Sequence, residues 1–368
     1  MKPHTALSAI PPGGKSPIIS NRSCWYGILK RIVTLKTGVV RDLNLSQTTK
    51  PLIVLLAVGF GVQHVDADMV VNFGTPTNQF SIDFVTIGNA GNAADTTGAP
   101  NPAGGVNYEY AISKYAISER LVNTVNTLSS SGLDDGLGIS IDTRGANKPA
   151  TSVSWHEAAR FVNWLNTNQG YSPAYKFVED TFQLWDQNDA GFDSDNHFRN
   201  SLAQYFLPSA DEFYKAAFYD PALGQYFDHA TGSNVAPTAV THGTISKSAV
   251  YGQPLSSGPA DVDLAGGLSP YGTMGQSGNV TEWEESALDG MNSFAGELRG
   301  MRGGHWQNTA NVLTNSSRFS AVPHLEFDKV GFRVASKAVA VPEPSGFMLL
   351  GLCAVMLSGR LWLARRRK

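Results

Sequence analysis

The stretch that decides the fold lies toward the C-terminal end and reads GNVTEW from Gly278 to Trp283, followed by RGGHW from Arg302 to Trp306. Arg318, Pro323 and the segment GFRVAS from Gly331 to Ser336 complete the series. A guanidinium group can satisfy several loop carbonyls and carboxylates at once. We therefore expect Arg302, Arg318 and Arg333 to serve the fold.

Upstream of this series, three serines mark the starts of short helices. Ser154 and Ser209 are each followed three residues later by glutamate, which is the capping-box pattern. Ser118 precedes ERLVNTVNTL, whose apolar positions lie on one helical face. Apolar residues behind Ser154 recur at the same helical spacing. The pattern predicts helices after Ser118, Ser154 and Ser209.

The region before these helices favours strands. Met69 to Val85 contains two segments with alternating apolar positions, and Tyr108 to Ile112 is a further candidate strand. Residues 88–105, rich in Gly, Ala, Asn and Pro, are typical of a loop. Together with low charge and many Gly, Asn, Ser and Thr residues, this predicts a loop-rich α+β domain over 68–340.

Two further phrases match a known family. Pro149 to Ala159 reads PATSVSWHEAA and Leu207 to Ala217 reads LPSADEFYKAA. With the C-terminal series, they resemble the formylglycine-generating enzyme family, also called sulfatase-modifying factors, over most of 69–336. The resemblance implies the family's variant of the C-type lectin fold, with twisted sheets and few helices.

The chain departs from the family's enzymes at one point. Those enzymes oxidise a sulfatase cysteine with two active-site cysteines placed between the GG element and the following arginine. The interval Gly304 to Arg318 here contains none, and the chain's two cysteines, Cys24 and Cys353, lie outside the expected domain. We therefore expect no catalytic residue of that type, no copper site, no thiolate zinc site and no disulfide.

The resemblance also implies a structural calcium ion. Its matching positions are Gly278, Val280 and Glu282, through backbone carbonyls and one carboxylate, which suit a hard cation. An asparagine ligand of the family is replaced by Gly275. The alternative is that Glu282 caps a turn or pairs with Arg302.

The family's substrate groove would place His305, Trp306, Asn308 and Arg318 beside a ligand. For Trp306 the sequence favours a core position over stacking on a sugar or peptide, and His305 is left open. No GxSxG element is present. The sequence does not indicate an iron site, because the histidines are scattered and show no HxxH spacing. The histidines considered were His156, His197, His229, His242, His305 and His324.

A polar insert, Phe177 to Gln204, separates two of the predicted helices. From Asp186 it superficially resembles an EF-hand loop, with Asn188 and Gly191 in register. Ala190 and His197 occupy positions that require oxygen ligands, so the match fails. A solvated loop is favoured over calcium binding.

The N-terminal end predicts export. Residues 1–67 are basic, and the short apolar run Pro51 to Val62 is followed by small residues near Ala67. This is typical of a secretory signal after a long extension. The alternatives are a buried core helix at 51–62 and a true start downstream of Met1.

The C-terminal end is more specific. Val341, Pro342, Glu343 and Pro344 precede an apolar stretch over 345–364 and a basic tail over 365–368. About 20 residues span a bilayer, and terminal basic residues stay in the cytoplasm. The order resembles the PEP-CTERM sorting signal, which implies processing by an exosortase; a simple tail anchor is the alternative.

Charge is segregated along the chain. Residues 68–344 hold fifteen Lys/Arg and 29 Asp/Glu, a formal net charge of −14. Such a surface repels phosphates, so nucleic acid is excluded as a partner.

The two ends of the chain together predict the location of the protein. We expect it to be anchored at the inner membrane before processing and to lie at the cell surface or outside the cell afterwards.

Three hypotheses follow for its function. The first is a non-catalytic binding or structural protein of the envelope or matrix, with extracellular polysaccharide or envelope components as partners. The second is a cysteine-independent, metal-dependent oxygenase or protein-modifying enzyme that uses the same groove. The third is a passive matrix protein without a specific ligand.

Overall fold

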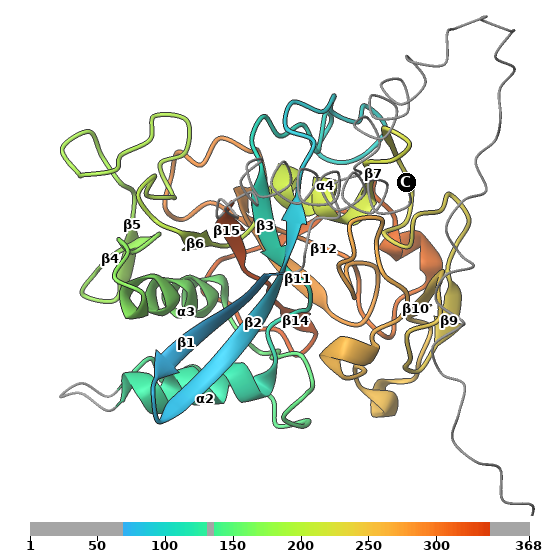
Figure 1. Cartoon of the computed structure of the whole chain (residues 1–368), viewed down its shortest axis with the longest axis horizontal. Coiled ribbons are helices and arrows are strands. Elements are labelled where there is room, and N and C mark those ends of the chain that lie inside the picture. The colour runs from blue at the N-terminus through green and yellow to red at the C-terminus, as the bar shows by residue number, and fades with distance from the viewer. Residues whose placement is uncertain (1–68, 131–135, 339–368) are drawn as a thin grey trace, which may run out of the picture. The chain divides into compact units, whose positions relative to one another are not determined.

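A computed structural model of the chain describes residues 69–130 and 136–338 (Figure 1). The predicted N-terminal extension and signal peptide (1–67) and the predicted sorting signal (341–368) lie outside the described residues. Within the described ranges, no helix is long and apolar enough to cross a membrane. The membrane-spanning helix expected at 345–364 therefore stays a prediction.

One sheet joins the two ends of the described domain. All its strands pair antiparallel in the order β1-β2-β3-β15-β6. The hairpin of β1 and β2 confirms the two predicted segments, with Phe73 opposite Phe80 and their rings stacked at 5.5 Å. The strand expected at Tyr108 begins two residues later. The strands are β1 (Met69–Thr75), β2 (Asn78–Ile87), β3 (Tyr110–Ser113), β6 (Tyr205–Phe206) and β15 (Ala335–Lys337).

A second sheet carries the motif series. Its order is β13-β12-β11-β14, and β11, which begins within GNVTEW, is buried along its whole length. Successive side chains of a strand point to opposite faces. The three glutamates of β11, Glu282, Glu284 and Glu285, therefore need buried partners. The strands are β11 (Thr281–Ala287), β12 (Arg299–Arg302), β13 (Phe319–Ala321) and β14 (Val330–Gly331).

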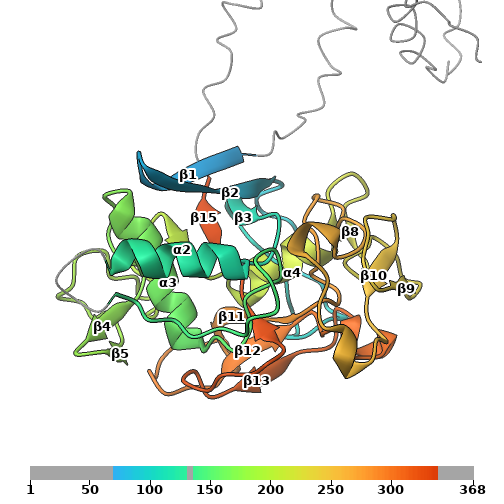
Figure 2. The same cartoon turned by 90° about the horizontal axis from the view of Figure 1, so that it is seen from below.

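The three predicted helices are confirmed. They are α2 (Glu119–Ser129), α3 (Trp155–Asn168) and α4 (Ala210–Phe218). Ser118 accepts a hydrogen bond from Leu121 N, while Ser154 and Ser209 each form a complete capping box. Helices α2 and α3 pack against each other beside the β1–β2 hairpin (Figure 2).

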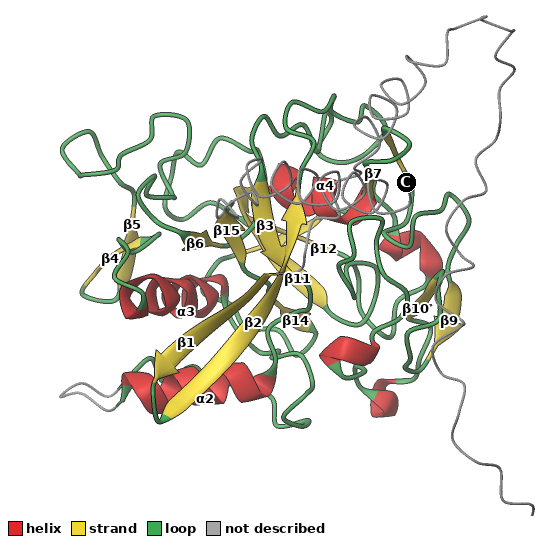
Figure 3. Cartoon of the chain, viewed as in Figure 1, coloured by secondary structure: helices red, strands yellow, loops and turns green. Residues whose placement is uncertain are grey.

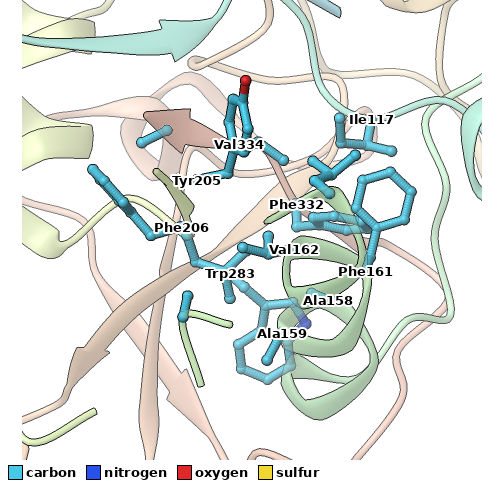
Figure 4. Close-up of a cluster of buried hydrophobic side chains, with 14 of the residues drawn as sticks. Ile117, Ala158, Ala159, Phe161, Val162, Tyr205, Phe206, Trp283, Phe332 and Val334 are labelled. Atoms are coloured by element: carbon cyan, nitrogen blue, oxygen red, sulfur yellow. The ribbon is translucent and has the colours of Figure 1, made fainter. Parts of the chain in front are cut away.

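The main core forms where α3 meets both sheets. Phe161 of α3 packs edge-on against Phe332 with ring centroids 5.3 Å apart, and Trp283 of β11 lies nearby (Figure 4). All three side chains are completely buried. The indole N–H of Trp283 donates to Val153 O at 2.9 Å, which satisfies its polar atom inside the core.

Loops connect most of the remaining elements (Figure 3). Two antiparallel pairs, β4 with β5 and β7 with β8, and one parallel pair, β9 with β10, are each two or three residues long. These elements are β4 (Lys176–Val178), β5 (Thr181–Gln183), β7 (Tyr219–Asp220), β8 (Gln225–Tyr226), β9 (Thr238–Val240), β10 (Ser248–Val250), η1 (Leu255–Ser257), η2 (Val262–Leu264) and η3 (Ala310–Leu313).

The insert at 177–204 corrects one expectation. It is not a solvated loop throughout, because it begins with the β4–β5 hairpin. Phe182 and Phe198 from this insert are buried against Trp155, with ring centroids 5.1 and 6.2 Å from it. The aromatic side chains bury apolar surface that a solvated loop would expose.

Candidate ligand-binding site

The segment from Arg302 to Arg318 leaves β12 through a tight turn. Gly303 and Gly304 both have positive φ angles of 95° and 70°. A Cβ on Gly303 would lie 3.0 Å from Gln276 O, so the segment passes close over the Gln276–Val280 turn. The backbone is tied there, since Gly278 N donates to Gly303 O at 2.7 Å and Trp306 N donates to Asn279 O at 3.0 Å.

Two arginines share the carboxylate of Glu284. Arg302 Nε lies 2.5 Å from Glu284 Oε1, and Arg318 Nε lies 2.7 Å from Oε2. Burial alone would raise the pKa of Glu284, but the two guanidinium groups outweigh it and lower the pKa below its usual value. Arg318 also donates to Leu288 O and Ala287 O. Its donors thus hold neighbouring loops together.

His305, Trp306 and Asn308 face different surroundings. Trp306 is completely buried in a small cluster with residues that include Val250 and Val280. Asn308 Oδ1 accepts a hydrogen bond from His305 N at 2.7 Å, which closes the turn. Burial lowers the pKa of the half-buried His305 imidazole to about 4, and the charge of Lys329 adds to this effect. The core position favoured for Trp306 is therefore confirmed, and its side chain cannot reach a ligand at the surface.

Glu282, one of the candidate calcium residues, belongs to a buried ion pair. Both carboxylate oxygens of Glu282 accept hydrogen bonds from Arg333, with Nη2 at 2.8 Å from Oε1. The expected alternative pairing of Glu282 with Arg302 is wrong, because Arg302 turns to Glu284. Gly278 and Val280 lie in the adjoining turn, where a Cβ on Gly278 would be 2.5 Å from Val250 O. A calcium ion here would share Glu282 with Arg333.

Other possible metal ligands lie apart. The residues that the structure describes contain no group of three or more His, Cys, Asp or Glu side chains able to hold a metal ion. Two carboxylates of the insert pair with the residue just before it, since Lys176 Nζ lies 2.6 Å from Asp189 and 3.6 Å from Asp186. Asp193 Oδ1 accepts a hydrogen bond from Asp195 N at 2.9 Å. These loop carboxylates thus hold local partners.

A surface cavity of about 510 Å³ lies beside the end of the Arg302–Arg318 segment. Its walls come from the loop between β2 and β3, from β8 and the loop after it, and from Asn315. These three stretches lie far apart in the sequence, and no sequence motif indicates that they meet. Sequence reasoning missed this site, and the resemblance directed attention to His305 instead. The polar side chains on its wall are Asp95, Thr96, Thr97, Tyr226, Asp228, Asn234 and Asn315.

Comparison with known proteins agrees with this architecture. The family model described as "Sulfatase-modifying factor enzyme 1-like domain" matches residues 74–338. The chain therefore belongs to the sulfatase-modifying factor family, as the motifs indicated. None of the curated proteins compared matches it.

Several solved structures are similar to the chain. Treponema denticola variable protein 1 is 18% identical with a TM-score of 0.50, covering 74% of this chain and 99% of its own. CarF is 17% identical with a TM-score of 0.45, covering 70% and 99%. PvdO from Pseudomonas aeruginosa is 18% identical with a TM-score of 0.42, covering 74% and 100%. At these identities, the likeness concerns the fold alone.

Proposed function

We propose that this chain is an exported, non-catalytic binding or structural protein of the envelope or matrix. Its sulfatase-modifying factor domain would be a C-type lectin-like variant that does not oxidise cysteine. The observation that carries this proposal is the interval from Gly304 to Arg318. It contains no cysteine, and its polar side chains Asn308, Asn315 and Arg318 brace the fold.

Export and sorting are proposed from the two ends of the chain. In this proposal the signal at 1–67 directs secretion, the helix at 345–364 anchors the protein in the inner membrane, and an exosortase-type enzyme cuts near Val341–Pro344. Extracellular polysaccharide or other envelope components are the proposed partners. The charge of −14 over residues 68–344 supports neutral or cationic partners rather than nucleic acid.

Processing is tested by the intact mass of the protein in the native host. The expected form begins near residue 68 and has lost the residues after Pro344. A Glu343→Ala variant should remain full-length at its C-terminus and stay in the membrane fraction. Loss of the tail from that variant, or no cleavage of either protein, would contradict sorting by this motif and favour a simple tail anchor.

Catalytic status is tested by elemental analysis of the purified protein, with melting recorded with and without chelator. Inertness toward cysteine-containing sulfatase peptides, with either no metal or about one calcium per chain, is the expected result. A chelator-sensitive melt would further assign the proposed calcium to the domain. Copper or iron near stoichiometry, or turnover of a peptide, would favour the rival metal-dependent oxygenase or protein-modifying enzyme.

A further inference from the structure

The cavity of about 510 Å³ has the size of a site for a small ligand. Ligand pockets typically enclose about 300–1,000 Å³ and present a few convergent polar groups. Here the groups come from Asp95 and Thr96 in the β2–β3 loop, from Asp228 and Asn234 after β8, and from Asn315. These residues come from three separate stretches of loop, so the geometry of the cavity depends on how the loops are tied together.

The loops are tied through the carboxylate of Asp95. Its Oδ1 accepts hydrogen bonds from the amide and hydroxyl of Thr97, while Oδ2 accepts from Tyr214 Oη at 2.6 Å and Asn315 Nδ2 at 3.3 Å. Burial alone would raise the pKa of Asp95, but these hydrogen bonds outweigh it and lower the pKa. Asp95 is thus a charged residue of the cavity lining that holds these loops together.

The loop that carries Asp228 and Asn234 is held in place by Asn315. Asn315 N donates to Asp228 O at 2.8 Å, and Asp228 N donates to Asn234 Oδ1 at 3.0 Å. The backbone of the Asp228 loop is therefore held against Asn315, and its carboxylate is carried on a fixed support. A preformed wall of this kind lowers the entropic cost of binding.

Several polar atoms of this wall are left without partners. Asn315 is only 4% exposed, yet its Oδ1 accepts no hydrogen bond from any described residue. This oxygen is not one of the fully buried, unpartnered polar atoms of the described residues, so it stays accessible to a hydrogen-bond donor of a ligand. Within the described part of the chain, the Asp228 carboxylate and the Thr96 hydroxyl also make no hydrogen bond or ion pair. The cavity thus offers mainly acceptors.

The charge of the lining has one sign. Asp95 and Asp228 are the only carboxylic acids among the described residues that line it, and no Lys, Arg or His of those residues does so. The acidic exported region adds to the same negative potential. An anionic ligand is therefore disfavoured, while a ligand with a protonated amine gains a charge-assisted hydrogen bond.

We propose that this cavity binds an amino sugar within a glycan, with its ammonium group at Asp228 and its hydroxyl groups at Asn315, Asn234 and Thr96. This inference rests on the proposed binding function and names its ligand class. A lysine side chain would use the carboxylate but would make no hydrogen bond to the three neutral polar side chains. An amino sugar carries hydroxyl groups around its amine, so it can bind the carboxylate and the neutral polar side chains at the same time.

The test titrates the full-length protein in detergent with glucosamine oligomers and, separately, with the same oligomers after N-acetylation. The two ligands differ in charge but share their ring and linkage. We expect binding of the amine form to be about tenfold tighter, and to weaken as salt rises. Equal affinity for both forms, or no binding of either, would overturn the proposal.

Two variants and a matched control locate the site. Asp228→Asn removes the charge and keeps the shape, and Thr96→Lys places a cation at the exposed mouth. Each should weaken glucosamine binding about tenfold or more without lowering the melting temperature. Asp263→Asn, which removes a carboxylate from a separate cavity of about 210 Å³, should leave binding unchanged. An equal loss in all three variants would contradict a site at Asp228.

Lysine-rich peptide serves as the competing ligand. We expect it to bind at least tenfold more weakly than a glucosamine oligomer of equal charge. Tighter peptide binding that is lost in Asp228→Asn would overturn the sugar assignment in favour of a basic peptide. Failure of glucosamine binding in a protein that is processed and inert would reject this inference alone. The opposite outcome is specific glucosamine binding by a protein that turns over a peptide or keeps its C-terminal tail. That outcome would reject the proposed function instead.

Discussion

Glu282 and Arg302 face each other as cross-strand partners in β11 and β12, yet their side chains bind different residues. Glu282 is held by Arg333, which also donates to Ser113 O at 2.9 Å in the five-stranded sheet. Arg302 pairs with Glu284. The Glu282–Arg333 pair therefore links the two sheets through a buried charge, and it gives the terminal GFRVAS motif a structural role.

Breaking this pair should be strongly destabilising. Arg333 and Glu282 are 0% and 1% exposed, so Glu282→Gln leaves a buried guanidinium without its counter-charge. We expect the free energy of unfolding to fall by about 3–5 kcal/mol, measured by urea denaturation. The control is Asp180→Asn, whose carboxylate pairs with Arg160 but is 90% exposed, and which should change stability by less than about 1 kcal/mol. Similar losses in both variants would contradict a buried-pair role.

The capping boxes should each stabilise their helix measurably. Ser154 Oγ accepts from Glu157 N at 3.2 Å, and Glu157 Oε2 accepts in return from Ser154 N at 2.8 Å. Ser154→Ala should cost about 1 kcal/mol in the free energy of unfolding. Thr127→Ala at an exposed position inside α2 should be neutral or slightly stabilising, because alanine has the higher helix propensity. An unchanged denaturation midpoint for Ser154→Ala would show that the cap adds nothing here.

Acid should destabilise the domain partly through His156. Burial, with the charges of Arg299, Arg160 and His324, lowers the pKa of His156 from 6.5 to about 4. Its Nε2 has no hydrogen-bond partner among the described residues. Between these two pKa values the unfolded chain binds more protons than the folded one, so stability is lost as the pH falls from about 6.5 to about 4.

The variant His156→Phe tests this linkage. Phe177 and Phe182 lie with ring centroids 6.0 and 5.9 Å from His156, so a phenyl ring suits the surroundings. The pH dependence of the free energy of unfolding should become shallower over that window, by up to one proton. His242→Gln, at an exposed histidine, is the matched control and should keep the wild-type slope. A His156→Phe slope equal to that of wild type would remove His156 from the acid response.

Two glycines with similar backbone angles separate steric clash from backbone strain. Gly278 and Gly272 have φ angles of 97° and 100°. A Cβ on Gly278 would lie 2.5 Å from Val250 O, whereas a Cβ on Gly272 would meet nothing within 4 Å. Gly272→Ala should therefore cost about 1–3 kcal/mol from φ alone, and Gly278→Ala clearly more. Equal losses by thermal or urea unfolding would show that the Gly278 turn can move away from Val250.

Local features of the fold could be predicted from the sequence. The starts of α3 and α4 depend on a serine and a glutamate three residues apart, so the hydrogen bonds that fix them lie within one turn. The β1–β2 hairpin follows from alternating apolar residues. Strand bounds were less certain: β3 begins at Tyr110 rather than Tyr108. The bounds of β3 are set by pairing with β15, which lies more than 200 residues away in the sequence.

The candidate site shows the opposite case. The resemblance directed attention to His305, whereas the core position favoured for Trp306 is confirmed and depends on packing against Val250 and Val280. The cavity near Asn315 has no sequence signal, because its walls come from loops near residues 95, 228 and 315. Likewise, the insert carries Phe182 and Phe198, whose burial depends on Trp155 in α3.

The amino-acid sequence by itself determined the family, the helix starts and the hairpin, because each rests on residue order or on hydrogen bonds between near neighbours. Only the tertiary structure decided which arginine neutralises which glutamate of β11. Several arginines compete for buried carboxylates, and the winner is set by the three-dimensional distance between side chains. The same holds for the cavity, whose Asp95, Asp228 and Asn315 meet only when the loops are packed.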